Sequence, residues 1–193
     1  MIQSKKDLEF YLREDRNRNL HCEHMNPLKF YFRLWAKVDG CMAYHYLKAL
    51  RKYEYAINCH KNGPIGNMIV LLRKVYLRRL SAKYNIIISP NTVGYGLYLP
   101  HIIGGGIVVI CESMGNNCVI NTNVLIGKKD FEDEKPIIGD NIEINSGAVI
   151  FGKIKIGNNA KIAPNTVVFK DVPEYGLVSG VPAQLIKIAN NQY

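Results

Sequence analysis

The sequence predicts a mainly β fold, a triangular parallel β-helix, that follows an α-helical region. The first observation is a six-residue repeat, which neither a helix nor a plain strand explains. Its apolar anchors are Val108, Met114, Ile120, Ile126, Ile138, Ile144, Ile150, Ile156, Ile162 and Val168. The second observation is a small or apolar residue four positions after most anchors, namely Cys118, Val124, Ile142, Ala148, Ile154, Ala160, Thr166 and Val172. In such a coil each short strand forms one wall of a prism, and the anchors stack in its core.

The third observation concerns the corners of the prism. Residues that tolerate left-handed backbone angles follow many anchors, in the pairs Asn116-Asn117, Asp140-Asn141 and Asn158-Asn159. The polar stretch 128–136 breaks the ladder, and we expect it to be a loop thrown out from one corner. Ile87, Val93 and Leu99 also step by six, three residues out of register with the later anchors. The coil therefore begins near Ile87, and 101–106 forms an irregular, glycine-rich corner.

Residues 1–85 predict helices, and 86–193 predict the β-helix with a C-terminal tail. Ser4 is expected to cap a first helix that runs to about Arg13. Pro27 opens a second helix, a third covers 42–57, and a fourth covers 65–83 after a turn at 62–64. On the fourth helix the apolar side, expected to pack in the core, consists of Met68, Leu71, Leu72, Val75, Tyr76 and Leu80. Its basic side consists of Arg73, Lys74, Arg78 and Arg79.

The net charge of +9 is concentrated in the helical region. Residues 1–85 hold 17 Lys and Arg against 7 Asp and Glu, an excess of +10. This excess is consistent with a solvated helical face, attraction for an anionic cofactor, or a docking face for an acidic membrane or a phosphate-bearing acceptor. Nucleic acid is not expected as a partner, because no base-reading motif accompanies the charge.

Other global features favour a cytoplasmic protein, with peripheral contact at the inner membrane face left open. No apolar run approaches the roughly 18 residues of a membrane span, and the N-terminus lacks the apolar core of a signal peptide. The five cysteines are scattered without metal-ligand spacing, so we expect buried free thiols and no metal.

Three segments carry a family resemblance. The stretches 96–101 (GLYLPH), 106–109 (GIVV) and 179–183 (SGVPA), together with the hexads between them, resemble the serine acetyltransferase branch of hexapeptide-repeat acyltransferases. The likeness covers about residues 86–188 and is nearest to members that act in surface-polysaccharide synthesis. It implies a left-handed β-helix, a homotrimer, acetyl-CoA as donor, and active sites between neighbouring subunits.

The resemblance places the catalytic histidine of the family on His101. A neutral imidazole can take the proton of an acceptor hydroxyl as that hydroxyl attacks a thioester. Glu112 is a candidate to orient this histidine, and a solvated corner residue is the alternative. Tyr95 and Tyr98 could form an aromatic wall for the acceptor. The other histidines, His21, His24, His45 and His60, are expected to have ordinary structural or surface roles.

The chain departs from the family at the amino-acid site. The acid that directly precedes the family's catalytic histidine is Pro100 here, and the acid that orients it falls near Ile87 or Ile88. The family's Arg-His pair falls on Glu134 and Lys135. Without a cation at that place, desolvating a serine carboxylate is costly.

Acetyl-CoA is expected along a groove between two coils, where it contacts backbone at the corners. The matching positions are Gly127, Lys128, Ser146, Gly147, Ala163 and Pro164. Lys170 and Lys187 are candidate phosphate partners near the C-terminal turn, with plain surface lysines as the alternative.

The sequence thus predicts an acetyl-CoA-dependent O-acetyltransferase. The expected acceptor is a sugar hydroxyl, small or lipid-linked, in surface-polysaccharide biosynthesis. Serine O-acetylation in cysteine biosynthesis is one alternative, and a non-catalytic trimeric scaffold is another. The acceptor, the pathway and any assembly beyond the trimer do not follow from the sequence.

Overall fold

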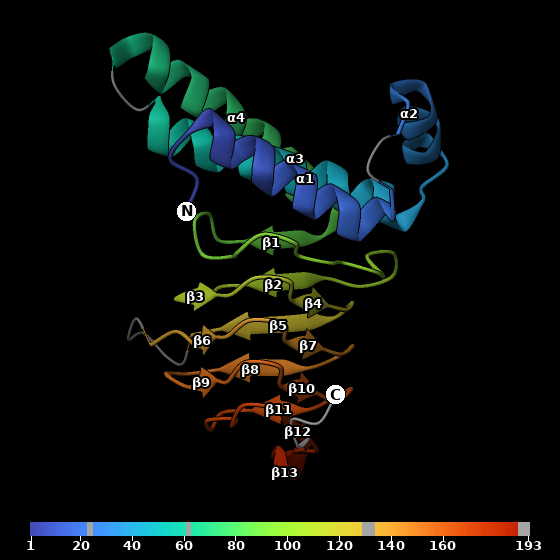
Figure 1. Ribbon diagram of the computed structural model, residues 1–193, viewed down its shortest axis with the longest axis vertical. Helices are drawn as coiled ribbons and strands as arrows, with labels where there is room; N and C mark the ends of the chain where they lie inside the picture. Colours follow the sequence, from blue (N-terminus) through green and yellow to red (C-terminus); the bar gives the residue numbers. More distant parts are fainter. Residues whose placement is uncertain (23–24, 61–62, 129–133, 189–193) are drawn as a thin grey trace.

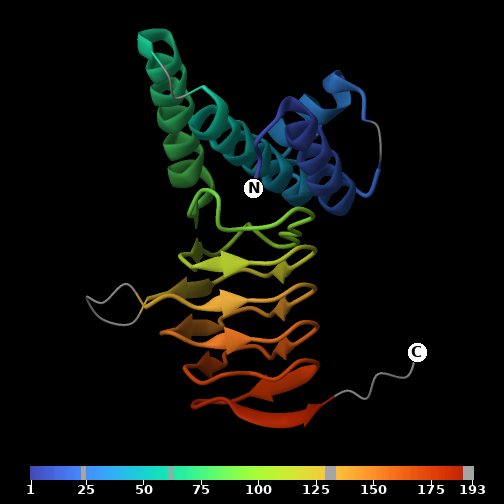
Figure 2. The same cartoon turned by 60° about the vertical axis from the view of Figure 1, so that its left-hand side comes forward.

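The computed structural model describes residues 1–22, 25–60, 63–128 and 134–188. Helices lie across one end of a column of short strands (Figures 1 and 2). The described helices are α1 (Lys5–Leu20), α2 (Pro27–Trp35), α3 (Asp39–Cys59) and α4 (Gly63–Tyr84). Helical elements thus end at Tyr84 and strands begin at Ile86. The division into two domains stays a prediction. The predicted turn at 62–64 is wrong at Gly63 and Pro64, which already belong to α4, because proline is tolerated in the first turn of a helix. Position 62 and most of the predicted loop at 128–136 lie outside the described ranges.

The strands stack as successive turns of one coil. They are β1 (Ile86–Ile88), β2 (Ile107–Val109), β3 (Ser113–Met114), β4 (Val119–Ile120), β5 (Val124–Gly127), β6 (Ile137–Ile138), β7 (Glu143–Ile144), β8 (Val149–Phe151), β9 (Lys155–Ile156), β10 (Lys161–Ile162), β11 (Val167–Val168), β12 (Gly176–Ser179) and β13 (Gln184–Ile188).

These strands form three sheets. The first sheet has the order β1-β2-β5-β8-β11, the second β3-β6-β9, and the third β13-β12-β10-β7-β4. Neighbouring strands pair in parallel, except for the antiparallel pair of β12 and β13. Each turn of chain therefore contributes one strand to each wall, as a parallel β-helix requires. The parallel sheets and the N-terminal helices agree with the predicted fold class, whereas the left hand of the coil stays an implication of the resemblance.

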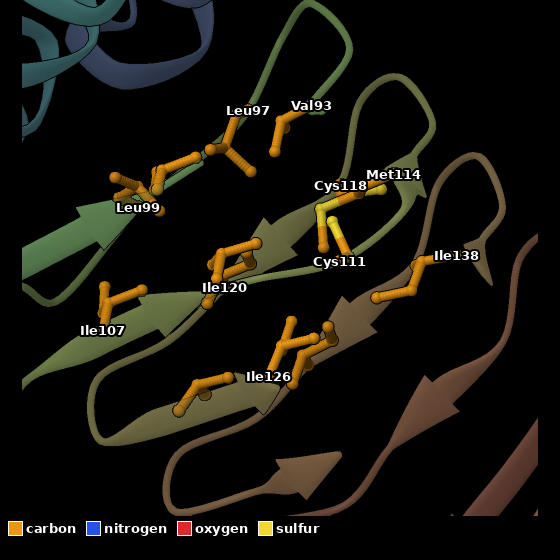
Figure 3. Close-up of a cluster of buried hydrophobic side chains, with 14 of the residues drawn as sticks. Val93, Leu97, Leu99, Ile107, Cys111, Met114, Cys118, Ile120, Ile126 and Ile138 are labelled. Atoms are coloured by element: carbon orange, nitrogen blue, oxygen red, sulfur yellow. The ribbon is translucent and has the colours of Figure 1, made fainter. Parts of the chain in front are cut away.

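The predicted anchors fill the interior of the prism. From Met114 to Val168 every anchor is at most 4% exposed, and the second set of small residues is at most 6% exposed. Figure 3 shows such side chains pointing inward from different walls. The prediction is wrong at the start of the ladder. Ile107 and Val109 are buried while Val108 is only half-buried, and Ile87 is 51% exposed between the buried Ile86 and Ile88.

Asparagines form the corners between the second and third sheets. Asn117, Asn141 and Asn159 adopt positive φ angles of 56°, 55° and 59°. Asparagine tolerates this left-handed conformation better than most residues, because its short polar side chain can hydrogen-bond locally. The dipeptides singled out in the sequence therefore mark real corners.

The first helix is longer than predicted. The Ser4 hydroxyl accepts a hydrogen bond from the Asp7 N–H at 3.1 Å, as expected of an N-cap. The helix continues to Leu20, however, and not only to Arg13. Its inward side buries Asp15 and Asn19 alongside Leu20, so hydrophobic periodicity could not trace it.

A buried polar network joins the helices to the first turn of the coil. Arg51 of α3 donates to the Asp15 carboxylate at 2.8 Å and to the Glu54 carboxylate at 3.1 Å. It also donates to the carbonyl of Val93 at 2.9 Å. Asp15 in turn accepts from the Gly96 N–H at 2.8 Å. The network therefore fixes α1 and α3 onto the segment that leads to His101.

The fourth helix does not bury the predicted apolar side. Leu80 is buried, but Met68, Leu71 and Leu72 are 56%, 58% and 62% exposed. Val75 and Tyr76 are each 43% exposed. The helix packs on α3 with a narrower strip that includes Leu77 and Leu80, because a single neighbouring helix covers only one part of its circumference.

Candidate functional site

His101 lies at an irregular corner of the coil. The segment 101–106 leads from Tyr98, which bridges to Val119 of the third sheet, to β2 of the first sheet. The His101 side chain is exposed, whereas the next residue, Ile102, is 5% exposed. An added Cβ at Gly105 would meet the side-chain oxygens of Asn123 and Thr122, so a side chain there would force these two to shift. The side chain of His101 therefore points to the surface, while the residue that follows it anchors the corner in the core.

Asp39 ties this corner to the helical region. The Ile103 N–H donates to the Asp39 carboxylate at 3.2 Å. Asp39 is the first residue of α3, so the bond connects the His101 segment to the start of that helix. Sequence reasoning missed Asp39, because the contact joins segments that lie far apart in the chain.

Four of the predicted acetyl-CoA residues lie at the same edge of the prism as His101. Ser146 and Gly147 occupy the corner between β7 and β8, and Ala163 and Pro164 occupy the corner between β10 and β11. We call the corners 101–106, 121–123, 145–147 and 163–165 the His101 edge. Each of them leads from the third sheet to the first.

Several other residues singled out in the sequence lie at a second edge, between the first and second sheets. We call its described corners, 110–112, 127–128, 134–136, 152–154 and 169–171, the Lys128 edge. It carries Glu112, Gly127, Lys128, Glu134 and Lys170. The Glu112 N–H donates to the Pro136 carbonyl at 3.0 Å, and its side chain is exposed. Within one chain, therefore, the structure does not bring Glu112 together with His101.

The two candidate tyrosines lie against α1. Tyr95 sits at a corner between the second and third sheets, with its ring 4.9 Å from that of Phe10 and 5.8 Å from that of Tyr11. It packs the first helix onto the coil and lies away from the His101 corner. Tyr98 lies on the outer face of the third sheet, where its hydroxyl is 3.4 Å from Nε2 of His21. Sequence proximity to His101 was a poor guide, because the chain turns a corner between these positions.

The last two candidates lie at the C-terminal end of the coil. Lys170 lines a cleft of about 230 Å³ formed by 167–173 and 182–185 together with Val178. Lys187 is exposed in β13, the strand that pairs antiparallel with β12. Of the two lysines only Lys170 lines this cleft, and a phosphate contact stays a prediction for both.

Three further expectations concern metal sites, membrane spans and cysteines. No group of three or more His, Cys, Asp or Glu side chains in those ranges is arranged to hold a metal ion. No described helix combines the length and apolar character of a membrane span. All five cysteines are free, but the expectation of burial is wrong for Cys59, which is exposed, and only partly met by Cys22.

The fold and the exposed corner histidine are consistent with the hexapeptide-repeat transferases, and comparisons with known proteins identify the group that the chain is similar to. The chain is 39% identical over 99 residues to a serine acetyltransferase of Staphylococcus aureus, covering 49% of this chain and 45% of that protein. It is 35% identical over 149 residues to serine acetyltransferase 4 of Arabidopsis thaliana, covering 75% of this chain and 40% of that protein. The chain thus spans less than half the length of these curated relatives. No protein-family model matches it.

Solved structures give the same class. The serine acetyltransferase of Neisseria gonorrhoeae superposes with a TM-score of 0.72 at 26% identity, covering 98% of this chain and 70% of that one. A serine acetyltransferase solved as a complex with CoA superposes with a TM-score of 0.69 at 25% identity, covering 95% and 72%. These similarities support the serine acetyltransferase-like group of hexapeptide-repeat acyltransferases. They do not support the polysaccharide-type branch over the others, because the relatives carry the serine acetyltransferase name.

Proposed function

We propose that the chain is an acetyl-CoA-dependent O-acetyltransferase in which His101 is the general base. The observation that carries this proposal is the exposed histidine on an irregular corner that stacks directly above regular corners of the coil. The similarity to serine acetyltransferases, one of them solved with CoA, supports acetyl-CoA as the donor.

The proton transfers of the proposed reaction take place between the two substrates and the histidine. The imidazole of His101 takes the proton of the acceptor hydroxyl, and the oxygen attacks the thioester carbonyl of acetyl-CoA. The tetrahedral intermediate then collapses, the bond from carbon to sulfur breaks, and the CoA sulfur receives the proton from the imidazolium. Backbone N–H groups at the stacked corners are suitable donors to the transient oxyanion.

A trimer would complete the site between chains. Outward-facing apolar residues run along the first sheet in continuous register: Ile87, Val108, Leu125, Val149 and Val167. If this face turns toward a three-fold axis, the His101 edge of one chain meets the Lys128 edge of the next. Glu112, Gly127 and Lys128 would then reach His101 from the neighbouring subunit. The separation of the two edges in one chain is therefore an argument for a shared site.

Serine is the acceptor that the comparisons favour. The relatives are named serine acetyltransferases, and a Neisseria gonorrhoeae structure of this name was solved in complex with serine, at 26% identity to this chain. On this reading the amino and carboxyl groups of serine would contact residues other than those of the family pattern.

A sugar hydroxyl is the second candidate, favoured by two residues of this chain. Pro100 directly precedes His101, and Glu134 lies on the Lys128 edge where the family has a cation. An unpaired serine carboxylate beside an acid would lose on the order of several kcal/mol, roughly 10²-fold or more in affinity. A neutral sugar avoids this penalty.

The test measures CoA release from acetyl-CoA with serine and with a panel of sugars. We expect His101→Ala to lower turnover by roughly 10²-fold or more, since the general base is removed, while the thermal unfolding midpoint changes little. His60→Ala, which removes an exposed histidine of the helical region, is the matched control.

The outcome separates the candidates. A kcat/KM for serine of about 10⁴ M⁻¹s⁻¹ or higher would exclude the sugar reading. No transfer to any acceptor, with binding of acetyl-CoA retained, would favour the non-catalytic scaffold.

A further inference from the structure

A cleft is formed jointly by the helical region and the segment that follows His101. It encloses about 500 Å³ and lies between the end of α2, the start of α3, the end of α4 and residues 102–105. One of its walls is thus the segment that begins at His101. The acetyl-CoA candidates on the regular corners do not line it, so it is distinct from the groove expected for the donor.

The walls of the cleft combine apolar surface with positive charge. Leu34, Trp35 and Ile103 contribute apolar side chains, and those of Trp35 and Ile103 are 78% and 56% exposed. Lys37 and Lys83 contribute cations. Within the described ranges, no carboxylate forms an ion pair with either lysine. A ligand that matches these walls carries an anionic group beside an apolar part.

The apolar surface continues out of the cleft along α2. Leu28, Phe32 and Trp35 recur at helical spacing and are 81%, 65% and 78% exposed. None of the residues of α2 is buried. This stripe meets the cleft at Trp35, so an apolar chain held in the cleft could extend along the helix. The stripe on α2 is long, and the apolar side chains that it meets in the cleft are mainly aliphatic. Such a surface fits a flexible hydrocarbon chain better than a compact nucleotide base.

We propose that this cleft binds a phosphate ester of a long, lipid-like alcohol, with the phosphate between Lys37 and Lys83 and the chain along Trp35 and α2. The excess positive charge of the helical region, which the acetyl-transfer chemistry does not use, would attract such a ligand. Acetylation of such a ligand near His101 would need a further free hydroxyl, for example on a sugar joined through the phosphate, and this part of the inference rests on the proposed function. The binding itself does not.

The experiment measures binding to the full chain by calorimetry with three probes. Geranyl phosphate carries both features, geraniol lacks the phosphate, and inorganic phosphate lacks the chain. We expect geranyl phosphate to bind at least about 10-fold more tightly than either of the others, because only it uses both parts of the cleft.

Two variants assign the contacts. Lys37→Gln with Lys83→Gln should weaken geranyl phosphate at least about 10-fold and leave geraniol unchanged. Trp35→Ala should weaken geranyl phosphate and geraniol but not inorganic phosphate. Lys74→Gln with Arg78→Gln, which removes the same charge from α4 outside the cleft, is the matched control and should bind as wild type.

Several results would overturn the proposal. Geranyl phosphate that binds no better than geraniol would remove the role of the lysines, and equal loss in the control pair would mean general charge attraction. Geranyl phosphate should bind to the His101→Ala variant as tightly as to wild type. If it does, but wild type transfers acetyl to no acceptor, the proposed function is contradicted. The assignment of the cleft would still stand.

Discussion

His45 is held between two tyrosines, away from the candidate active site. Its Nδ1 is 2.9 Å from the Tyr84 hydroxyl, and its Nε2 is 2.8 Å from the Tyr76 hydroxyl. Burial, followed by the positive charges of Lys83 and Lys48, lowers the pKa of His45 below its ordinary value. The neutral ring can accept one hydrogen bond and donate the other, so folding favours the uncharged form.

This lowered pKa predicts a pH dependence of stability. As pH falls below the ordinary histidine value, the unfolded chain takes up a proton at His45 before the folded chain does, so the free energy of unfolding decreases. We expect His45→Gln to make the decrease between pH 7.5 and 5.5 shallower, measured by urea denaturation. His60→Gln should leave the slope nearly as in wild type. Equal slopes for wild type and His45→Gln would contradict the assignment.

For single residues, the sequence predicted which side chains are buried wherever the six-residue pattern repeats. Where the pattern is interrupted, that prediction failed. Most anchors from Ile120 onward follow corners that contain Gly or Asn, so their inward direction could be predicted. The run Ile107-Val108-Val109 is uniformly apolar, and periodicity cannot say which of its members face inward. His101 came from resemblance. The hydrogen bond of Asp39 and the position of the two lysines in the cleft were missed, because both bring together segments that are distant in the chain.

At the scale of elements, the helices are attached to the coil by charge as well as by apolar packing. The guanidinium of Arg51 is fully buried with Asp15 and Glu54. A buried pair of this kind adds little compared with well-packed apolar residues, but breaking it leaves a charge without a partner.

Removal of this arginine should therefore be costly. We expect Arg51→Met to lower the free energy of unfolding by about 3–5 kcal/mol, because Asp15 and Glu54 would remain buried without a cation. The measurement is urea denaturation followed by circular dichroism. The matched control is Arg13→Met, which removes an exposed arginine beside Glu14 and should cost at most about 1 kcal/mol. A loss for Arg51→Met no larger than for this control would mean that the network is not a major attachment.

Element boundaries were predictable where local chemistry marks them. Ser4 and Pro27 begin the first two helices as expected. The end of α1 was not predictable, because a helix that buries polar groups lacks an apolar stripe. The buried face of α4 was not predictable either, because an apolar stripe does not reveal which neighbour will cover it. The exposed apolar side chains of α4 and α2 show this second limit directly.

At the scale of the whole molecule, the first sheet presents an apolar face in a single chain. Ile87 and Leu125 are 51% and 45% exposed, and Val108, Val149 and Val167 between and beyond them are half-buried. The other outward faces are more polar: Ser113 and Lys155 lie on the second sheet, and Glu143 and Lys161 lie on the third. A three-fold assembly would remove this apolar column from water, and each buried Leu contributes roughly 1.5–3 kcal/mol.

We therefore expect wild-type protein to be a trimer in solution at micromolar concentration, measured by light scattering, and Leu125→Lys to dissociate it. The lysine would bring three like charges together in a desolvated interface. Ile137→Lys, an outward apolar position on the second sheet that is 42% exposed, is the matched control and should remain trimeric. Because the His101 and Lys128 edges lie apart in one chain, dissociation should abolish acetyl transfer even though His101 is intact. An active Leu125→Lys monomer would show that a single chain holds the complete site, and a wild-type monomer would contradict the assembly itself.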